Sequence, residues 1–274
     1  MSFVSHHNRV VKAGRKRAEK LEPKLAASVL TVLDRTADEA ARGFSHSAVD
    51  HLAADAGEHP TNWTPPLANE VIDVDTLIAQ FRGKTDPVRR ALIEAVMGAA
   101  LAGHGLDFDV TNPLTSKVLA QSGSQIVDIA STTQLNVMRI IRESYEAGLT
   151  IPDTAKAIRS GMKEANVARS LLIARTEMVG AVNGGSLAAT QIVSDSSVAA
   201  GEAGMLKEWL TAEGAQFPRH EEYDDLDGQT VELDAAFDVG GTELMFPGDP
   251  DGPPEEICNC RCALAYVEAG GAGA

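Results

Sequence analysis

The sequence predicts a mainly α-helical protein, with an extended helical N-terminal region followed by a small α+β C-terminal module. Aromatic residues make up only 4% of the 274-residue chain while hydrophobic residues make up 44%, which favours helices packed through small and aliphatic side chains. Apolar residues recur at helical spacing up to about residue 200. Beyond that point, short apolar pairs alternate with glycine, proline and acidic clusters, a texture typical of an irregular α+β module.

The first predicted helix covers residues 24 to about 41, whose apolar side chains share one face. It is expected to continue back through the basic N-terminal segment, with a kink at Pro23. Prolines between residues 57 and 66 predict a break. Asp86-Pro87 then has the order of a cap followed by proline in the first turn, so a second helix is expected to begin there and to end near Gly103.

Three further helical segments are expected. Residues 126–146 form an amphipathic stretch that Gly148 stops. Thr150 and Asp153 have the spacing of a capping box and predict a short helix. Residues 167–193 carry the longest apolar periodicity, which Asn183-Gly184-Gly185 interrupts; either the helix bends there or a close neighbour needs the missing side chains.

The C-terminal module is expected to turn tightly and then enter a short terminal strand. Cys258, Cys260 and Cys262 are all the cysteines of the chain, and their alternation predicts three sulfurs on one face of that strand. Residues 226–229 read as a turn into a strand at 230–233, with Gly228 supplying the unusual backbone angle. Trp209 and Phe246 are expected to anchor the core of the module.

The change of texture places a domain boundary near residue 200, between the helical region and the Cys-containing module at 201–267, and residues 268–274 are expected to form a flexible Gly/Ala tail. No apolar run approaches the ~20 residues of a membrane span, so no span is expected. Three clustered thiols give no disulfide framework, which fits a reducing compartment.

Charge is distributed unevenly along the chain, whose formal net charge is −15. Residues 1–24 carry seven Lys or Arg against two Glu, whereas residues 202–274 carry three basic groups against seventeen acidic ones. The basic N-terminal segment and the acidic C-terminal segment suggest partners of opposite charge, although a run of charged residues is also typical of a solvated face. The candidate DNA-contacting residues are Arg9, Lys12, Arg15, Lys16, Arg17 and Lys20.

A structural zinc site is one interpretation of the cysteines. Cys-x-Cys offers two close thiolates, and His220 could complete a set drawn from Cys258, Cys260 and Cys262. A metal would help a small, loop-rich module that buries little apolar surface. The alternative is that the cysteines are compact buried hydrophobes and that His220 makes a structural hydrogen bond. The acidic surroundings oppose a redox-active dithiol.

A series of short motifs appears in order between residues 148 and 267. The series is Gly148-Leu149-Thr150-Ile151-Pro152-Asp153, Ala174-Arg175-Thr176-Glu177 with Asn183, Lys207-Glu208-Trp209-Leu210-Thr211, Arg219-His220, Leu226-Asp227-Gly228-Gln229, Phe246-Pro247-Gly248-Asp249-Pro250 and Asn259-Cys260-Arg261-Cys262. Together they resemble the phage Mu F-like minor head protein, or head morphogenesis, family. The structural motif residues are Arg175, Glu177, Trp209, Asp227, Gly228, Asn259 and Arg261. The chain departs from the family pattern at residues 212–218 and 221–225.

The resemblance implies a minor capsid protein of a tailed bacteriophage that acts in head assembly or genome delivery. Its implied partners are the portal protein, the major capsid or scaffolding protein, and packaged double-stranded DNA. It implies a location in the virion, in the head interior or at the portal vertex, and in the host cytoplasm during assembly. It implies no catalytic residue. It also implies a division of the helical region, in which residues 1–147 look like the variable helical arm of such proteins and residues 148–200 like the helical part of the Mu F-like region.

Three classes of function remain open at this stage. The first is a structural protein that binds the portal or inner head, which is not an enzyme. The second is an ejection protein that contacts DNA through its basic N-terminus, with binding that weakens steeply as salt rises. The third is a metal-dependent hydrolase or nuclease that uses His220, for which no nucleophile elbow, phosphate loop or metalloprotease motif is present.

Overall fold

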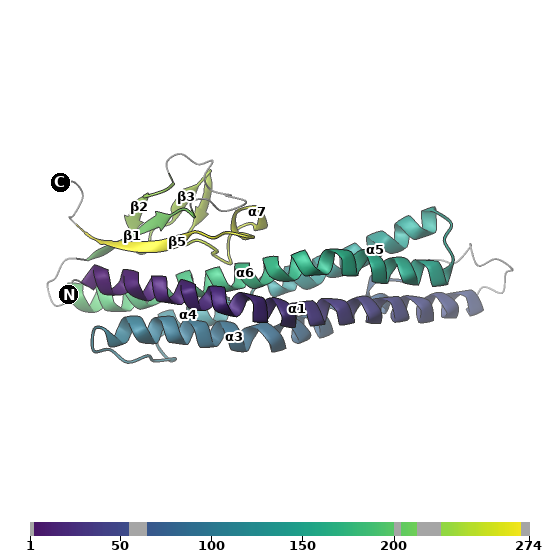
Figure 1. The fold of residues 1–274 in the computed structure, drawn as a ribbon, viewed down its shortest axis with the longest axis horizontal. Helices are drawn as coiled ribbons and strands as arrows, with labels where there is room; N and C mark the ends of the chain where they lie inside the picture. Colours follow the sequence, from purple (N-terminus) through teal and green to yellow (C-terminus); the bar gives the residue numbers. More distant parts are fainter. Residues whose placement is uncertain (1–2, 55–64, 200–203, 213–225, 270–274) are drawn as a thin grey trace. The chain divides into compact units, whose positions relative to one another are not determined.

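The fold of the computed structural model is mainly helical with a small C-terminal module of strands, as predicted (Figure 1). The structure describes residues 3–54, 65–199, 204–212 and 226–269. The long helices are α1 (Phe3–Ala54), α3 (Val74–Ala102), α5 (Ile126–Glu146) and α6 (Ile151–Ala199). The shorter helices are α2 (Ala68–Val71), α4 (Pro113–Gln121) and α7 (Pro254–Ile257). The strands are β1 (Met205–Leu210), β2 (Thr230–Glu232), β3 (Phe237–Val239), β4 (Thr242–Leu244) and β5 (Ala263–Glu268).

The α3 helix contains Pro87 instead of starting at it, so the predicted start at Asp86-Pro87 is wrong. Proline leaves the carbonyl four residues earlier without its helical hydrogen bond. That carbonyl belongs to Gly83, and both Gly83 and Pro87 are exposed, so water can satisfy it. Asp86 pairs with the Arg89 side chain in the next turn rather than capping a helix end.

The α6 helix is continuous over 49 residues, where the sequence predicted a short helix and then a longer one. Its start agrees with the capping box: the Thr150 hydroxyl donates to Asp153 at 2.6 Å, and the Asp153 N–H donates to the Thr150 oxygen at 3.3 Å. The helix continues through Ser160-Gly161 because Met162 and Asn166 in the following turns are buried. Burial of these side chains outweighs the low helix propensity of a single glycine.

The described residues form two compact units. One combines Met1–Leu25, Asp86–Ser124 and Leu172–Ala274, and the other combines Ala26–Thr85 and Gln125–Leu171. The secondary structure described in the second unit is helical, and the core of this unit includes Leu33, Phe44 and Phe81, each fully buried. Along α5 the buried positions recur every three or four residues, which agrees with the predicted amphipathic helix.

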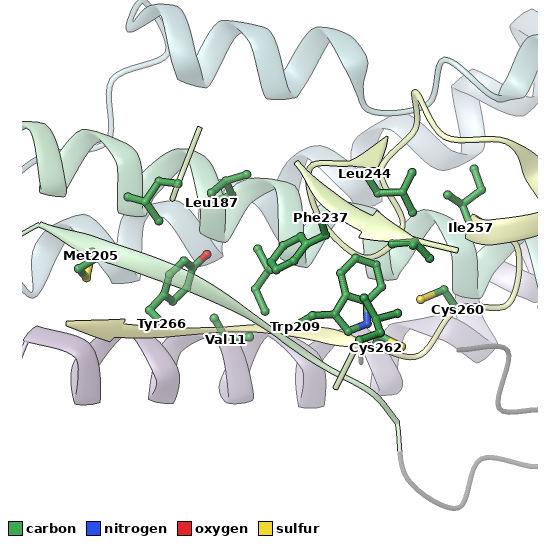
Figure 2. Packing of buried hydrophobic residues seen from close by; sticks show 14 residues of the cluster. Val11, Leu187, Met205, Trp209, Phe237, Leu244, Ile257, Cys260, Cys262 and Tyr266 are labelled. Atoms are coloured by element: carbon green, nitrogen blue, oxygen red, sulfur yellow. The ribbon is translucent and has the colours of Figure 1, made fainter. Parts of the chain in front are cut away.

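The first unit contains the strands. β2, β1 and β5 form an antiparallel sheet in that order, with Lys207 of β1 opposite Val231 and Tyr266. β3 and β4 form a separate hairpin. Figure 2 shows the apolar core between these strands and the helices, in which Trp209 and Phe237 pack edge to face with ring centroids 5.2 Å apart. The cluster comprises Val11, Leu187, Met205, Trp209, Leu226, Leu233, Phe237, Val239, Leu244, Ile257, Cys260, Cys262, Leu264 and Tyr266.

The cysteines precede the terminal strand, so the prediction of three sulfurs on one strand face is wrong. Cys258 follows the end of α7, and β5 begins at Ala263, after all three cysteines. Asn259 breaks the alternation because its φ of 62° lies in the left-handed region, which an extended strand cannot contain. Asparagine is one of the few residues other than glycine that adopts this conformation readily.

Among the helices that the structure describes, none combines the length and apolar character needed to cross a membrane.

Candidate functional site

The candidate site is a polar junction in the first unit between α6 and the segments around β5. At its centre Asn183, only 1% exposed, occupies the helix face towards the strand. Its amide nitrogen donates to the carbonyls of Pro247 at 2.9 Å and Cys262 at 3.3 Å, and its oxygen accepts the Leu264 N–H at 3.2 Å. The Asn183 side chain therefore satisfies three backbone groups, one in the loop at Pro247 and two around the start of β5, at Cys262 and Leu264.

A second asparagine, Asn8, also bonds through its side chain to backbone groups of β5. Asn8 of α1 donates to the Tyr266 carbonyl at 3.1 Å and accepts the Tyr266 N–H at 2.9 Å. The partner strand β1 lies on the other side of β5, so these groups belong to the outer edge of the sheet. Asn8 and Asn183 thus supply the hydrogen bonds that a further strand would otherwise make, and they close this edge against pairing.

About two turns before Asn183, the Arg175 side chain ties the junction to two other segments. Its guanidinium donates to the Asn259 side-chain oxygen and forms an ion pair with Glu22 at 2.8 Å. The neighbouring Thr176 hydroxyl oxygen accepts the Asn259 N–H at 3.1 Å. Asn259 is held at both its backbone and its side chain, which stabilises its left-handed conformation where the loop reverses.

Glu177 forms a buried ion pair with Arg89 of α3. Arg89 is only 3% exposed, and its second nitrogen pairs with Asp86. Burial raises the pKa of Glu177, while the Arg89 charge acts in the opposite direction. Arg175 and Thr176 therefore both bond to Asn259, whereas Glu177 pairs with Arg89, so each of these three adjacent polar residues of α6 has a polar partner.

The glycines of α6 allow close packing, which selects the second of the two alternatives that the sequence left open. A Cβ atom on Gly180 would lie 2.7 Å from the Gly248 carbonyl oxygen, and one on Gly184 would lie 3.1 Å from the Phe246 ring. Gly248 itself has a φ of 78°. The helix does not end at these glycines; they let the 246–248 loop approach its backbone.

A cavity of about 290 Å³ opens beside the junction. Charged groups of both signs line it, including Arg15, Glu19, Glu22, Arg175 and Arg261. Arg15 donates to the Arg261 carbonyl at 3.3 Å, which ties α1 to the segment before β5.

Asp227 and Gly228 form the turn that leads into β2. The Asp227 carboxylate accepts the Thr211 N–H at 2.8 Å and the Thr211 hydroxyl at 2.9 Å. Gly228 has the positive φ, 77°, that the sequence predicted for it, and its N–H donates to the Trp209 carbonyl at 2.8 Å. Trp209 is fully buried, as a core anchor would be.

The predicted zinc ligands are only partly described. His220 lies outside the described residues. Cys260 and Cys262 are buried within the apolar cluster, and Cys258 is half-buried (Figure 2). Within the described ranges, no three His, Cys, Asp or Glu side chains are arranged to hold a metal ion. The position of the two buried thiols is that of packed apolar side chains.

The predicted DNA-contacting residues all lie on α1. Arg9, Lys12, Lys16, Arg17 and Lys20 are exposed, whereas Arg15 is half-buried through its bond to the Arg261 carbonyl.

The burial of Arg89 and Lys207 was not predicted from the sequence, although the spacing of apolar residues around each of them indicated it. Arg89 shares the helical face of Leu92, Ile93 and Val96, so its spacing already placed it towards the core. Lys207 alternates with Met205 and Trp209, which puts it on the inner face of β1, fully buried.

Lys207 is held by backbone and carboxylate groups inside the module. Its ammonium donates to the Met245 carbonyl at 2.7 Å and lies 5.1 Å from the centroid of the Phe237 ring. Burial lowers the pKa of Lys207 to about 8, opposed by the charges of Asp249 and Asp234. Asp249 in turn accepts the N–H groups of Met245 and Asp251, which fixes the loop that Lys207 contacts.

The chain is 28% identical over 145 residues to the uncharacterized protein YqbB of Bacillus subtilis (strain 168), a match that covers 51% of this chain and 45% of YqbB. The chain therefore matches less than half the length of this relative. No family model matches the chain. No solved structure matches it at a significant level.

Proposed function

We propose that the chain is a minor head protein of a tailed bacteriophage, which binds the portal or inner head during assembly and has a structural rather than an enzymatic role. The observation that carries this proposal is where the motif residues lie. Arg175, Glu177 and Asn183 of α6, and Asn259 and Arg261 before β5, belong to one junction although up to 86 residues separate them. A set of residues that resembles a family in its order thus also acts together in space.

The chemistry of the junction supports a structural role. The side chains of Asn183 and Arg175 bond to backbone carbonyls, to Asn259 and to Glu22, so their polar groups are already used in holding segments together. A catalytic site would instead direct a nucleophile and a base at a space where substrate can enter. The relative YqbB is itself uncharacterized and adds no function.

The test is assembly with the portal protein encoded by the same phage. The tagged full-length chain is co-expressed with that portal protein, purified, and the recovered portal protein is measured by quantitative mass spectrometry. We expect recovery with the portal protein, and expect it to fall when Asn183→Ala loosens the junction. Lys156→Ala, an exposed change on the same helix, is the matched control and should leave recovery unchanged. Recovery of the chain alone, with portal protein soluble in the same lysate, would refute the proposal.

A further inference from the structure

The basic residues near the start of α1 form one continuous row. Lys12, Lys16 and Lys20 repeat every four residues, Arg9 and Lys24 extend the row at either end, and all five are exposed. Residues four apart lie one above another on a helix, about 6 Å apart along its axis. The row from residue 9 to residue 24 is therefore about 22 Å long. We call these five residues, together with the exposed Arg17 beside them, the basic row.

Four members of the basic row, among the described residues, differ in their ion pairing from several exposed arginines of the chain. Arg35, Arg90 and Arg139 each pair with a glutamate one turn further on, at 2.6 to 3.0 Å. By contrast, within the part of the chain that the structure describes, no acidic side chain pairs with Lys12, Lys16, Arg17 or Lys20.

The spacing of the basic row destabilises the isolated helix. The pairs Lys12–Lys16, Lys16–Lys20 and Lys20–Lys24 place like charges one turn apart, where they repel each other. Arg35, Arg90 and Arg139 each have a glutamate one turn further on that compensates their charge. Lys12, Lys16 and Lys20 repeat at the same spacing without an acidic partner among the described residues, so their charges are instead matched to a linear polyanion.

We propose that the basic row binds the phosphate backbone of duplex DNA. Duplex DNA carries one negative charge about every 1.7 Å of its axis, so a row of cations spaced about 6 Å apart meets phosphates along its whole length. The rest of the chain carries an excess of acidic residues, since the net charge is −15 despite this row. The basic row therefore attracts DNA while the acidic excess opposes its approach, which favours one orientation of the protein on the duplex. The choice of DNA over an acidic protein rests on the proposed function, because a head protein shares its compartment with the packaged genome.

The test is the salt dependence of binding, measured by fluorescence anisotropy with a labelled 30-base-pair duplex of mixed sequence and the full-length chain. Contacts from four to six cations predict a slope of log Kobs against log salt of about −4 to −5. The variant Lys12→Gln, Lys16→Gln, Lys20→Gln should flatten that slope by about 2.7. The control Lys84→Gln, Lys117→Gln, Lys156→Gln removes the same charge from exposed helical sites and should keep the wild-type slope. All substituted side chains are exposed, and far-ultraviolet circular dichroism checks that the helices are intact.

Equal slopes for the two triple variants, or no binding by the wild type at 50 mM salt, would overturn the proposal. Binding to poly-L-glutamate but not to the duplex would also overturn it and would identify an acidic protein as the partner. The portal assay separates this proposal from the proposed function. Loss of DNA binding with portal recovery intact counts against the basic row alone, whereas normal DNA binding without portal recovery counts against the head-assembly role.

Discussion

Replacing Asn183 with alanine tests the structural importance of the junction most directly. The substitution removes two donated hydrogen bonds and one accepted hydrogen bond from a position that is 1% exposed. It leaves the carbonyls of Pro247 and Cys262 and the N–H of Leu264 without this partner. A buried polar group that loses its partner costs about 1–3 kcal/mol.

The expected loss for Asn183→Ala is about 3 kcal/mol. Three groups at about 1 kcal/mol each give that value when the smaller alanine admits water, and the cost is larger when the site stays dry. Alanine returns up to about 0.7 kcal/mol because it is the better helix former. The net loss of unfolding free energy is therefore at least about 2 kcal/mol.

The matched control is Gln191→Ala on the same helix. Gln191 is also a carboxamide, but it is half-buried and makes one bond to the junction region, to the Leu233 carbonyl at 3.1 Å. Its loss should stay below about 1 kcal/mol. Urea denaturation followed by tryptophan fluorescence reports on Trp209 inside the same unit. If the two variants lose the same free energy, the account of Asn183 as a three-way bridge fails.

Four further predictions concern buried charges, glycines and thiols. Glu177→Gln should lower the unfolding free energy by about 1.5–3 kcal/mol, because the buried Arg89 then keeps only Asp86 as a charged partner. The double variant Arg89→Met, Glu177→Leu should lose less, and a double variant no more stable than Glu177→Gln would contradict this. Lys207 has a pKa of about 8 when folded, below its ordinary value of 10.5, so the unfolded chain holds more protons between these values and the unfolding free energy should rise by about 1.6 kcal/mol from pH 8 to 9.5. Lys207→Met should remove that rise, and its persistence in the variant would assign it to another group. Gly180→Ala should destabilise by about 1–3 kcal/mol because its Cβ would collide with the Gly248 carbonyl, whereas Gly98→Ala, which meets open space, should stabilise by about 0.5–1 kcal/mol, both read from thermal melts; equal shifts would remove the close-contact argument. The purified chain should melt at the same temperature with and without a strong chelator, because Cys260 and Cys262 pack as apolar side chains. Stoichiometric zinc in the purified chain by elemental analysis, together with a lower melting temperature once the chelator removes it, would support the zinc interpretation instead.

Short sequence motifs correctly predicted the helix ends and turns that depend only on interactions between neighbouring residues. The capping box at Thr150, the stop at Gly148 and the turn at Gly228 depend on neighbouring residues only, and all three agree with the structure. Amphipathic spacing gave α5 its limits for the same reason. The helical class followed from composition, which is also a property of the chain without its contacts.

Predictions that depended on distant contacts were less successful. Pro87 signalled a helix start, but burial of Phe81 and Thr85 before it keeps α3 continuous. The cysteine alternation signalled a strand, but Thr176 and Arg175, more than 80 residues earlier, hold Asn259 in a left-handed conformation that a strand excludes. The partners of Asn8 and Arg89 lie too far along the chain for any spacing pattern to reveal.

The bonds between Asn8 and Tyr266 join residues 258 positions apart, which has a consequence for the order of folding during translation. At about 5–20 residues per second, the ribosome needs roughly 13–50 s to make the strand segment that α1 awaits. Throughout that interval Val11 and the other apolar residues that α1 later buries against the module have no cover. The unit is therefore completed only after β5 has been made, and a nascent chain truncated before β5 exposes the apolar face of α1 to chaperones and proteases.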